Sequence, residues 1–297
     1  MKKFLIIPGL PRCATTSLAN VLGKHPQIFL PKIKEPHFFL PDKEAYFMFN
    51  RKGKKHSFFK TGFISSIKDF EINYNNFNSE QIFIDGSTLY CVHLEALENL
   101  RNFADIDPYF IILRKDPFKR AVSHYLYSIS RGEEFRTFDK ALQDEVEGKY
   151  PKWLWGGYVA GSDSKKCENF IIENWGEHKL LSADIDEDNV FSDDYLRKIF
   201  SFLGVDYVSI DTSVKANPLI HIDNPLLMEF RILIKRIRQI NPAIFDNRIS
   251  RKLFNTFMKA VPVRKNAAEE LDKFRDLFMD HFWAYEESLK KIDLTGK

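Results

Sequence analysis

The sequence predicts an α/β protein in which a central parallel sheet is flanked by helices. Three apolar runs support this prediction, at residues 4–7, 82–84 and 109–113, and a helical pattern follows each run. Strands that are apolar throughout are covered on both faces, which is typical of a parallel sheet between two layers of helices. With 297 residues, of which 44% are hydrophobic, the chain is long enough to bury a large core.

The chain is expected to form one domain over residues 1–297 with a helical C-terminal part from about residue 226. Residues 226–240 and 252–261 show helical apolar spacing and a basic polar face, and residues 267–292 predict a final amphipathic helix. The basic faces are most simply solvent-exposed. We find no repeat, low-complexity segment or linker that would divide the chain.

A tight turn and an amphipathic helix follow the first strand. Pro8, Gly9 and Pro11 end the strand, and a helix is predicted from Thr15, with apolar positions at Leu18, Val21 and Leu22. Backbone N–H groups of such a turn and of the first helical turn point to one spot, where the helix dipole favours negative charge. The stretch therefore predicts an anion site.

This turn differs from the phosphate loop of nucleotide triphosphatases. That loop reads G-x-x-x-x-G-K-[ST], in which the lysine reaches the outer phosphates and the hydroxyl holds magnesium. In the frame that begins at Gly9, the second glycine is Ala14 and the lysine position is Thr15. Arg12, the cation of the loop, stands three residues before that position. An ordinary kinase is therefore not predicted, because Thr15 stands where the phosphate loop requires its lysine.

The turn resembles the 5′-phosphosulfate loop of the sulfotransferases that use 3′-phosphoadenosine 5′-phosphosulfate (PAPS), which typically reads P-[KR]-[SG]-G-T-[TR]. The resemblance implies that Arg12 is the catalytic Lys/Arg, and that Thr15 and Thr16 bind the phosphate that carries the sulfate. Ala14 replaces the family's glycine. The implied donor-binding residues are Pro11, Arg12, Cys13, Ala14, Thr15, Thr16 and Ser17. The alternative is a strand-to-helix turn without a ligand.

A proline-rich stretch, residues 24–42, follows and is expected to be largely loop and short strand. Within it, KEPHFF at residues 34–39 resembles a segment of many sulfotransferases, the heparan-type enzymes among them, whose glutamate is the catalytic base. The resemblance assigns that role to Glu35, with His37 as the rival base. A solvated loop glutamate is the alternative for Glu35. The basic residues 43–60 predict a mobile surface segment, either solvated or in contact with an acidic acceptor.

The second strand ends at Asp85, and a helix is predicted to follow it. This region resembles the family's [ED]-x-[ST]-P-x-Y segment near the acceptor site, with Thr88 in place of the proline. Gly86 stands where heparan-type enzymes carry an active-site lysine, which weakens the case for a heparan-like acceptor. An apolar strand that closes on an aspartate also fits a Walker B element, so a kinase remains the alternative.

The third strand leads into RKDPFKRAVSHYLYSISRG, residues 114–132, which resembles the family's 3′-phosphate motif R-[ND]-P-x-x-R-A-x-S-x-Y. The matching residues are Asp116, Pro117, Arg120, Ala121, Ser123 and Tyr125. The family arginine directly precedes the Asn/Asp, whereas here Lys115 stands there and Arg114 comes one residue earlier. Either cation is expected to bind the 3′-phosphate with Ser123. We favour Arg114, because it directly follows the strand and a guanidinium binds phosphate bidentately.

Together the two motifs predict a PAPS-dependent sulfotransferase that releases PAP, with a P-loop nucleotide kinase or a non-catalytic nucleotide-binding protein as alternatives. Sulfuryl transfer depends on positioning and charge stabilisation. A sulfuryl group carries less negative charge than a phosphoryl group, so no metal is expected. A carbohydrate hydroxyl is the expected acceptor, with a small-molecule or lipid hydroxyl next. Trp153, Trp155 and Tyr158 either line an acceptor cleft or pack in the core.

The composition limits the partners and the compartment. A net charge of +3 implies no general polyanion binding, so no nucleic-acid partner is expected. The three cysteines lack metal-type spacing and are expected to be reduced thiols of a cytoplasmic protein. No apolar run approaches transmembrane length. The start, MKKFLII, is similar to that of a signal peptide, but its apolar run is too short and ends at Pro8. The oligomeric state is not readable from the sequence.

Overall fold

The computed structural model of this chain describes residues 2–41, 47–49, 55–57, 64, 66–74, 82–103, 105–131, 134, 136–149, 156–213 and 267–295. A sheet of five parallel strands lies at the centre, in the order β2-β5-β1-β6-β7. Its strands are β1 (Lys2–Gly9), β2 (Ile28–Phe29), β5 (Ile82–Asp85), β6 (Ile106–Arg114) and β7 (Leu180–Asp184). The predicted parallel sheet is confirmed.

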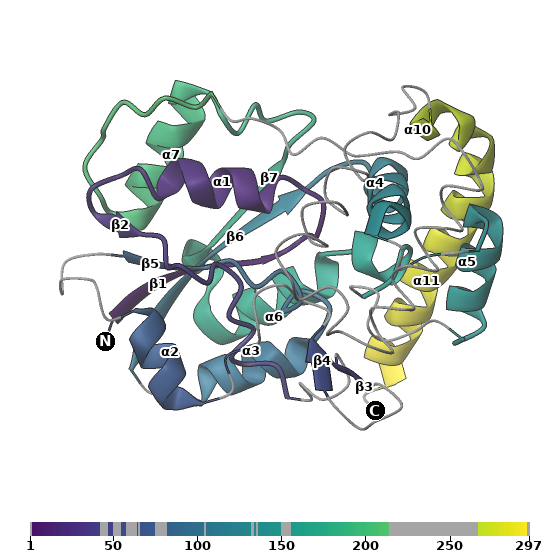
Figure 1. The fold of residues 1–297 in the computed structure, drawn as a ribbon, viewed down its shortest axis with the longest axis horizontal. Helices are drawn as coiled ribbons and strands as arrows, with labels where there is room; N and C mark the ends of the chain where they lie inside the picture. The colour runs from purple at the N-terminus through teal and green to yellow at the C-terminus, as the bar shows by residue number, and fades with distance from the viewer. Residues whose placement is uncertain are drawn as a thin grey trace, which may run out of the picture.

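Helices cover both faces of this sheet, as predicted (Figure 1). One face carries α1 (Thr15–Leu22) and α7 (Asp193–Leu203). The other face carries α2 (Ile67–Asn73), α3 (Leu94–Arg101) and α6 (Lys165–Trp175). Helix α7 has both of its ends marked in the sequence, because the Ser192 side chain accepts the N–H of Tyr195 and Gly204 ends the helix at a φ of 67°.

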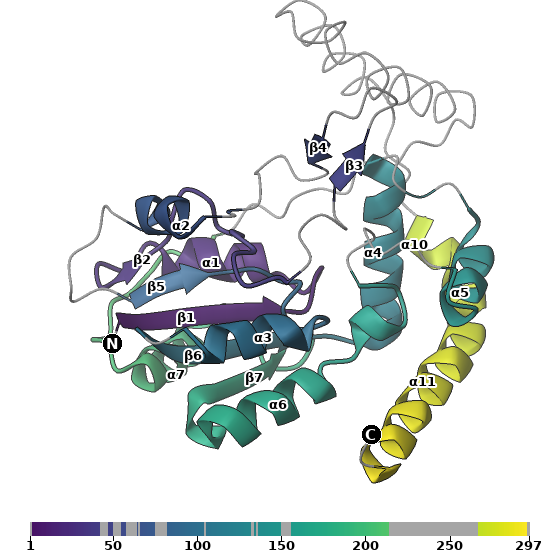
Figure 2. The ribbon, with the colours of Figure 1, turned by 90° about the horizontal axis from the view of Figure 1, so that it is seen from below.

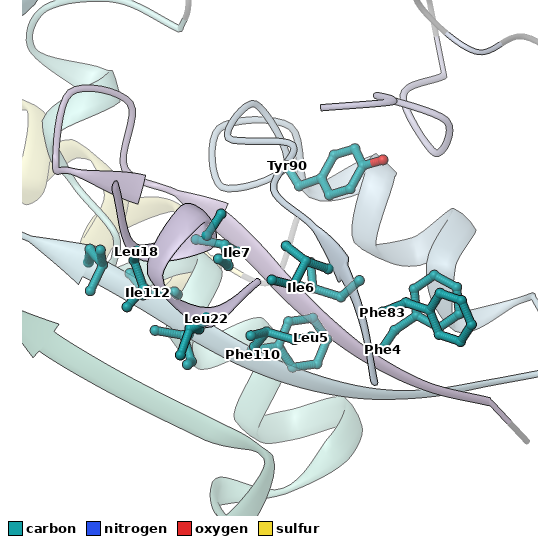
Figure 3. Close-up of a cluster of buried hydrophobic side chains, with 14 of the residues drawn as sticks. Phe4, Leu5, Ile6, Ile7, Leu18, Leu22, Phe83, Tyr90, Phe110 and Ile112 are labelled. Carbon is teal, nitrogen blue, oxygen red and sulfur yellow. The ribbon is translucent and has the colours of Figure 1, made fainter. Parts of the chain in front are cut away.

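The apolar residues of β1 form the centre of the core (Figure 3). Phe4 stacks on Phe83 of β5, with 4.8 Å between the ring centroids. Leu5 belongs to the same cluster as Leu22 of α1 and Phe110 of β6. Burial of each large apolar side chain stabilises the fold by about 1.5–3 kcal/mol. This core therefore sets the positions of the loops that leave the carboxyl ends of the strands.

A second hydrophobic cluster lies beyond those carboxyl ends, and in Figure 2 the arrow of β1 points toward it. It is formed by α4 (Pro117–Arg131), α5 (Phe138–Val146), α11 (Arg275–Thr295) and the residues Tyr158 and Val159, which directly precede the 3-10 helix η2 (Ala160–Ser162). Phe118 packs against Phe278 with 5.7 Å between the ring centroids. Tyr158, a candidate for the acceptor cleft, is buried in this cluster, whereas Trp153 and Trp155 lie outside the described residues.

The C-terminal part differs in detail from the prediction. The single helix predicted over residues 267–292 is divided into α10 (Ala267–Glu270), the 3-10 helix η5 (Asp272–Phe274) and α11. Helix α11 packs on α4 and α5, so it completes a core. The helices predicted over residues 226–261 lie outside the described residues.

Short elements complete the described chain. The strands β3 (Phe47–Phe49) and β4 (Lys55–Ser57) pair antiparallel within the basic stretch of residues 43–60, where the sequence predicts no strand. The remainder of that stretch lies outside the described residues. The 3-10 helix η3 (Glu177–Lys179) leads into β7. Within the described ranges, every helix is too short or too polar to pass through a lipid bilayer.

Candidate active site

The turn between β1 and α1 lies at the carboxyl end of the central strand. The N–H of Leu10 donates to the carbonyl of Leu113 in β6 at 2.9 Å, which holds the turn against the neighbouring strand. Arg12 and Ala14 have φ values of 74° and 57°, in the left-handed region that costs an L residue roughly 1–2 kcal/mol. Ala14 thus adopts the conformation for which glycine is the usual choice. The first turn of α1 has no side-chain cap, so its N–H groups are available to an anion.

Arg12 joins the turn to helix α4. Its Nε donates to Ser123 Oγ at 3.4 Å, across 111 residues of sequence. Its guanidinium also lies over the ring of Tyr127, 4.3 Å from the centroid. Burial lowers the pKa of Arg12 below its usual value, although Tyr127 opposes this effect. The guanidinium still carries its charge, because an arginine is not deprotonated in proteins. The structure therefore brings the loop of the first predicted motif to the serine of the second.

Arg120, from α4, is 0% exposed and forms hydrogen bonds that hold the turn between β1 and α1 in place. Its Nε donates to the carbonyl of Pro11 at 3.0 Å, and its Nη1 donates to the carbonyl of Gly157 at 2.7 Å. A Cβ at Gly161 would lie 2.9 Å from the guanidinium nitrogens, so the glycine leaves room for this contact. The sequence comparison matched Arg120 to the 3′-phosphate motif without a role. In the structure, this side chain positions the turn.

The half-buried carboxylate of Glu145 holds the segment that follows Gly157. Both Glu145 oxygens, from α5, accept backbone N–H groups at 2.7–3.1 Å, from Tyr158, Val159 and Ala160. Burial raises the pKa of Glu145, whereas these amides and the charge of Arg120 lower it. No sequence pattern marked Glu145, because its hydrogen-bond partners are backbone amides that any residue supplies.

The two candidate cations for the 3′-phosphate have different partners. Arg114 Nη1 lies 3.2 Å from Glu168 Oε1 of α6, and the Arg114 side chain is 41% exposed. Burial lowers the pKa of Lys115, while the nearby Cys13 raises it and the charge of Arg12 lowers it. The Lys115 ammonium is therefore near the turn. The sequence argument favours Arg114. The ion pair of Arg114 with Glu168 and the electrostatic interaction of Lys115 with Cys13 and Arg12 of the turn favour Lys115, and which of the two binds a phosphate stays a prediction.

The candidate base lies in a charged cluster beside α1. Glu35 Oε1 lies 2.6 Å from Lys34 Nζ, and Glu35 Oε2 lies 3.5 Å from His37 Nε2. Lys34 Nζ also donates to Thr16 Oγ1 at 3.2 Å. Burial raises the pKa of Glu35, but Lys34 and His37 outweigh this and hold it at about 2. Glu35 is therefore ionised at neutral pH. The Lys34 ammonium, which contacts both Glu35 and Thr16, links it to the first turn of α1.

Backbone contacts attach this cluster to the end of β5. The N–H of Gly86 donates to the carbonyl of Lys34 at 2.9 Å, and the N–H of His37 donates to Ser87 Oγ at 2.9 Å. His37 is 1% exposed and has a φ of 49°. The segment that the resemblance expects to carry the base and the segment that it expects near the acceptor therefore lie side by side.

Asp85, the candidate Walker B residue, is 0% exposed. Its carboxylate accepts the N–H of Ser87 at 3.0 Å and the hydroxyl of Tyr90 at 3.2 Å. Burial raises the pKa of Asp85 to about 6, while Ser87, His37 and Tyr90 lower it. This carboxylate therefore stabilises the turn after β5. Among the described residues, no group of three His, Cys, Asp or Glu side chains is arranged to hold a metal ion.

Comparison with known proteins identifies the fold. No protein-family model matches the chain, and no curated protein is significantly similar in sequence. The structure is similar to that of a sulfotransferase from Alicyclobacillus acidocaldarius, with a TM-score of 0.60 and 21% sequence identity over 84% of this chain and 99% of that chain. The predicted sulfotransferase-like fold is therefore confirmed.

Two further structures align less well. The sulfotransferase domain from the curacin biosynthetic pathway has a TM-score of 0.44 at 13% identity, over 92% of this chain and 97% of that chain. A mouse sulfotransferase complexed with PAP has a TM-score of 0.40 at 14% identity, over 92% of this chain and 89% of that chain. Because both scores are low, neither of these two structures contributes to the fold assignment.

Proposed function

We propose that the chain is a PAPS-dependent sulfotransferase, which transfers a sulfuryl group to an acceptor hydroxyl and releases PAP and a sulfate ester. The observation that carries this proposal is the contact between Arg12 and Ser123, because it joins the two motifs that resemble the two ends of a PAPS site. The fold shared with a sulfotransferase supports it. A kinase would need a lysine where the chain has the buried Thr15.

The residues around the turn suit a nucleotide with two anionic ends. We assign the 5′-phosphosulfate end to residues 11–17, where backbone N–H groups and Arg12 supply donors and positive charge. We assign the 3′-phosphate to the Ser123 hydroxyl, with Lys115 or Arg114 as its cation. When bound, PAPS supplies an activated sulfuryl group whose leaving group is PAP.

Glu35 is the general base that takes the proton of the acceptor hydroxyl, because an alcohol is a poor nucleophile while it keeps that proton. Arg12 stabilises the charge that develops on the leaving oxygen. His37, 3.5 Å from Glu35, is the rival base. We propose a carbohydrate hydroxyl as the acceptor, with a small-molecule or lipid hydroxyl next. A reaction without metal and a cytoplasmic location remain predictions.

The donor is tested by thermal shift. PAP in the presence of EDTA is expected to raise the melting temperature in a concentration-dependent way, because a ligand of the folded state stabilises it by about 2.7 kcal/mol at 100 times its Kd. The comparison ligands are PAPS, ATP and GTP, each with and without magnesium. Stabilisation by ATP only with magnesium, together with phosphate transfer, would refute the sulfotransferase and support the kinase.

The 3′-phosphate site is tested by three single substitutions. Ser123→Ala and Lys115→Ala are each expected to weaken PAP binding by about 1.5–3 kcal/mol, the usual contribution of a hydrogen bond to a charged group. Adenosine 5′-phosphosulfate, which lacks the 3′-phosphate, should bind these variants nearly as well as it binds the wild type. Calorimetry on both ligands measures this difference. A large effect of Arg114→Ala with none of Lys115→Ala would place the phosphate on the Arg114 side.

A further inference from the structure

The ammonium of Lys34 lies between the candidate base and the first helix of the fold. It is 2.6 Å from Glu35 Oε1 and 3.2 Å from Thr16 Oγ1. The Lys34 side chain is only 15% exposed, although a lysine without a specific partner normally extends into solvent. This positive charge is therefore held one hydrogen bond from the N-terminus of α1, where an anion is expected.

Gly86 provides the space through which the Lys34 side chain passes. A Cβ at position 86 would lie 2.9 Å from Lys34 Cε and 3.2 Å from Nζ. The N–H of Gly86 also donates to the Lys34 carbonyl, so the backbones of the two residues are joined. The close atoms belong to the far end of a flexible side chain. A larger residue at position 86 would therefore displace the ammonium and leave the fold intact.

Resting on the proposed function, we propose that Lys34 is a second anion-binding group of the site, whose ammonium moves from Glu35 to the sulfuryl group when the donor binds. The movement is short, because Nζ already contacts Thr16 at the N-terminal end of α1. Glu35 and the sulfuryl group are two anions that compete for one ammonium.

This competition controls the base. In the free protein, Lys34 is the strongest of the groups that hold the pKa of Glu35 at about 2 against the effect of burial, and His37 is the other. His37 also interacts electrostatically with Asp85 at the end of β5, where it lowers the pKa of that carboxyl. When Lys34 leaves, Glu35 becomes a stronger base. Glu35 is thereby activated only when a sulfuryl group is in place.

Lys34→Gln tests the proposal through binding, without any acceptor. The Kd of PAPS is expected to rise roughly tenfold or more, as for a lost hydrogen bond between charged groups, and the Kd of PAP less than about twofold, because PAP lacks the sulfuryl group. Lys34→Arg, which keeps the charge, should recover most of the preference for PAPS. The matched control is Lys32→Gln, an exposed lysine of the same loop, which should leave both constants unchanged.

Two further variants separate a direct contact from a general loss of charge. Gly86→Ala should lower the preference for PAPS as Lys34→Gln does, but it should cause no further loss in the Lys34→Gln background. Glu35→Gln removes the carboxylate that competes for the Lys34 ammonium. When Lys34 is present, this variant should therefore bind PAPS severalfold more tightly relative to PAP than the wild type does. In the Lys34→Gln background, the same substitution should have a clearly smaller effect.

The outcomes are distinguishable. If the wild type binds neither PAP nor PAPS, the proposed function fails and the role of Lys34 fails with it. If the wild type binds both ligands, but Lys34→Gln changes the two constants equally or leaves both unchanged, only the role of Lys34 is overturned. Additive effects of Gly86→Ala and Lys34→Gln would likewise overturn it.

Discussion

Glu35→Gln is expected to lower sulfuryl transfer by about 10²–10⁴-fold, the usual contribution of a positioned general base. The amide keeps the shape of the side chain but cannot accept the proton of the acceptor hydroxyl. The PAP affinity should stay within about twofold, because PAP lacks the group that Lys34 recognises. Initial rates with labelled PAPS, on the best acceptor from a panel of carbohydrate and lipid alcohols, measure the first effect, and calorimetry with PAP measures the second.

The pH dependence of kcat/KM gives a second test of the same base. This parameter reports the free enzyme, in which Lys34 and His37 hold the pKa of Glu35 at about 2 against burial. The carboxylate therefore remains deprotonated as the pH falls from 8 to about 5, and no loss of kcat/KM from this group is expected in that range. Removal of the positive charge in Lys34→Gln raises the pKa of Glu35, so a loss should then begin at a higher pH than in the wild type.

Two controls complete this test. Glu71→Gln, on the exposed surface of α2, should leave transfer unchanged. If His37→Ala abolishes transfer while Glu35→Gln retains it, the base is His37 and Glu35 only balances the charge of Lys34.

Arg120→Met is expected to lower the free energy of unfolding by about 3–5 kcal/mol. The substitution leaves the buried carbonyls of Pro11 and Gly157 without their Arg120 donor, and it removes a positive charge that interacts with the half-buried Glu145. Methionine fills much of the same volume, so the loss reports these polar contacts. Urea unfolding followed by circular dichroism measures it.

The matched control is Arg197→Met on α7. Arg197 forms an ion pair with Asp193 at 3.0 Å, but its side chain is 53% exposed, so the change should be under about 1 kcal/mol. If Arg120→Met instead keeps the stability of the wild type and loses only PAP affinity, Arg120 is a ligand-binding residue and does not hold the turn.

The sequence by itself determined the main strands and the turn at the candidate site. The apolar runs in β1, β5 and β6 predict buried strands, because burial on both faces requires apolar residues at successive positions. The turn after Gly9 was equally readable, because proline and glycine act on the backbone beside them. The division of the C-terminal helix into α10, η5 and α11 was not readable, because the apolar pattern continues through the interruption.

Only the tertiary structure decided which side chains meet. Arg120 holds the turn through Pro11, 109 residues earlier, and through Gly157, 37 residues later. Lys34 passes through the space left by Gly86, a relation that no local pattern contains. Arg114, the last residue of β6, pairs with Glu168 of α6, whereas the next residue, Lys115, interacts with Cys13 and Arg12 of the turn. Local patterns report the backbone, whereas the partners of a charged side chain depend on how distant segments pack.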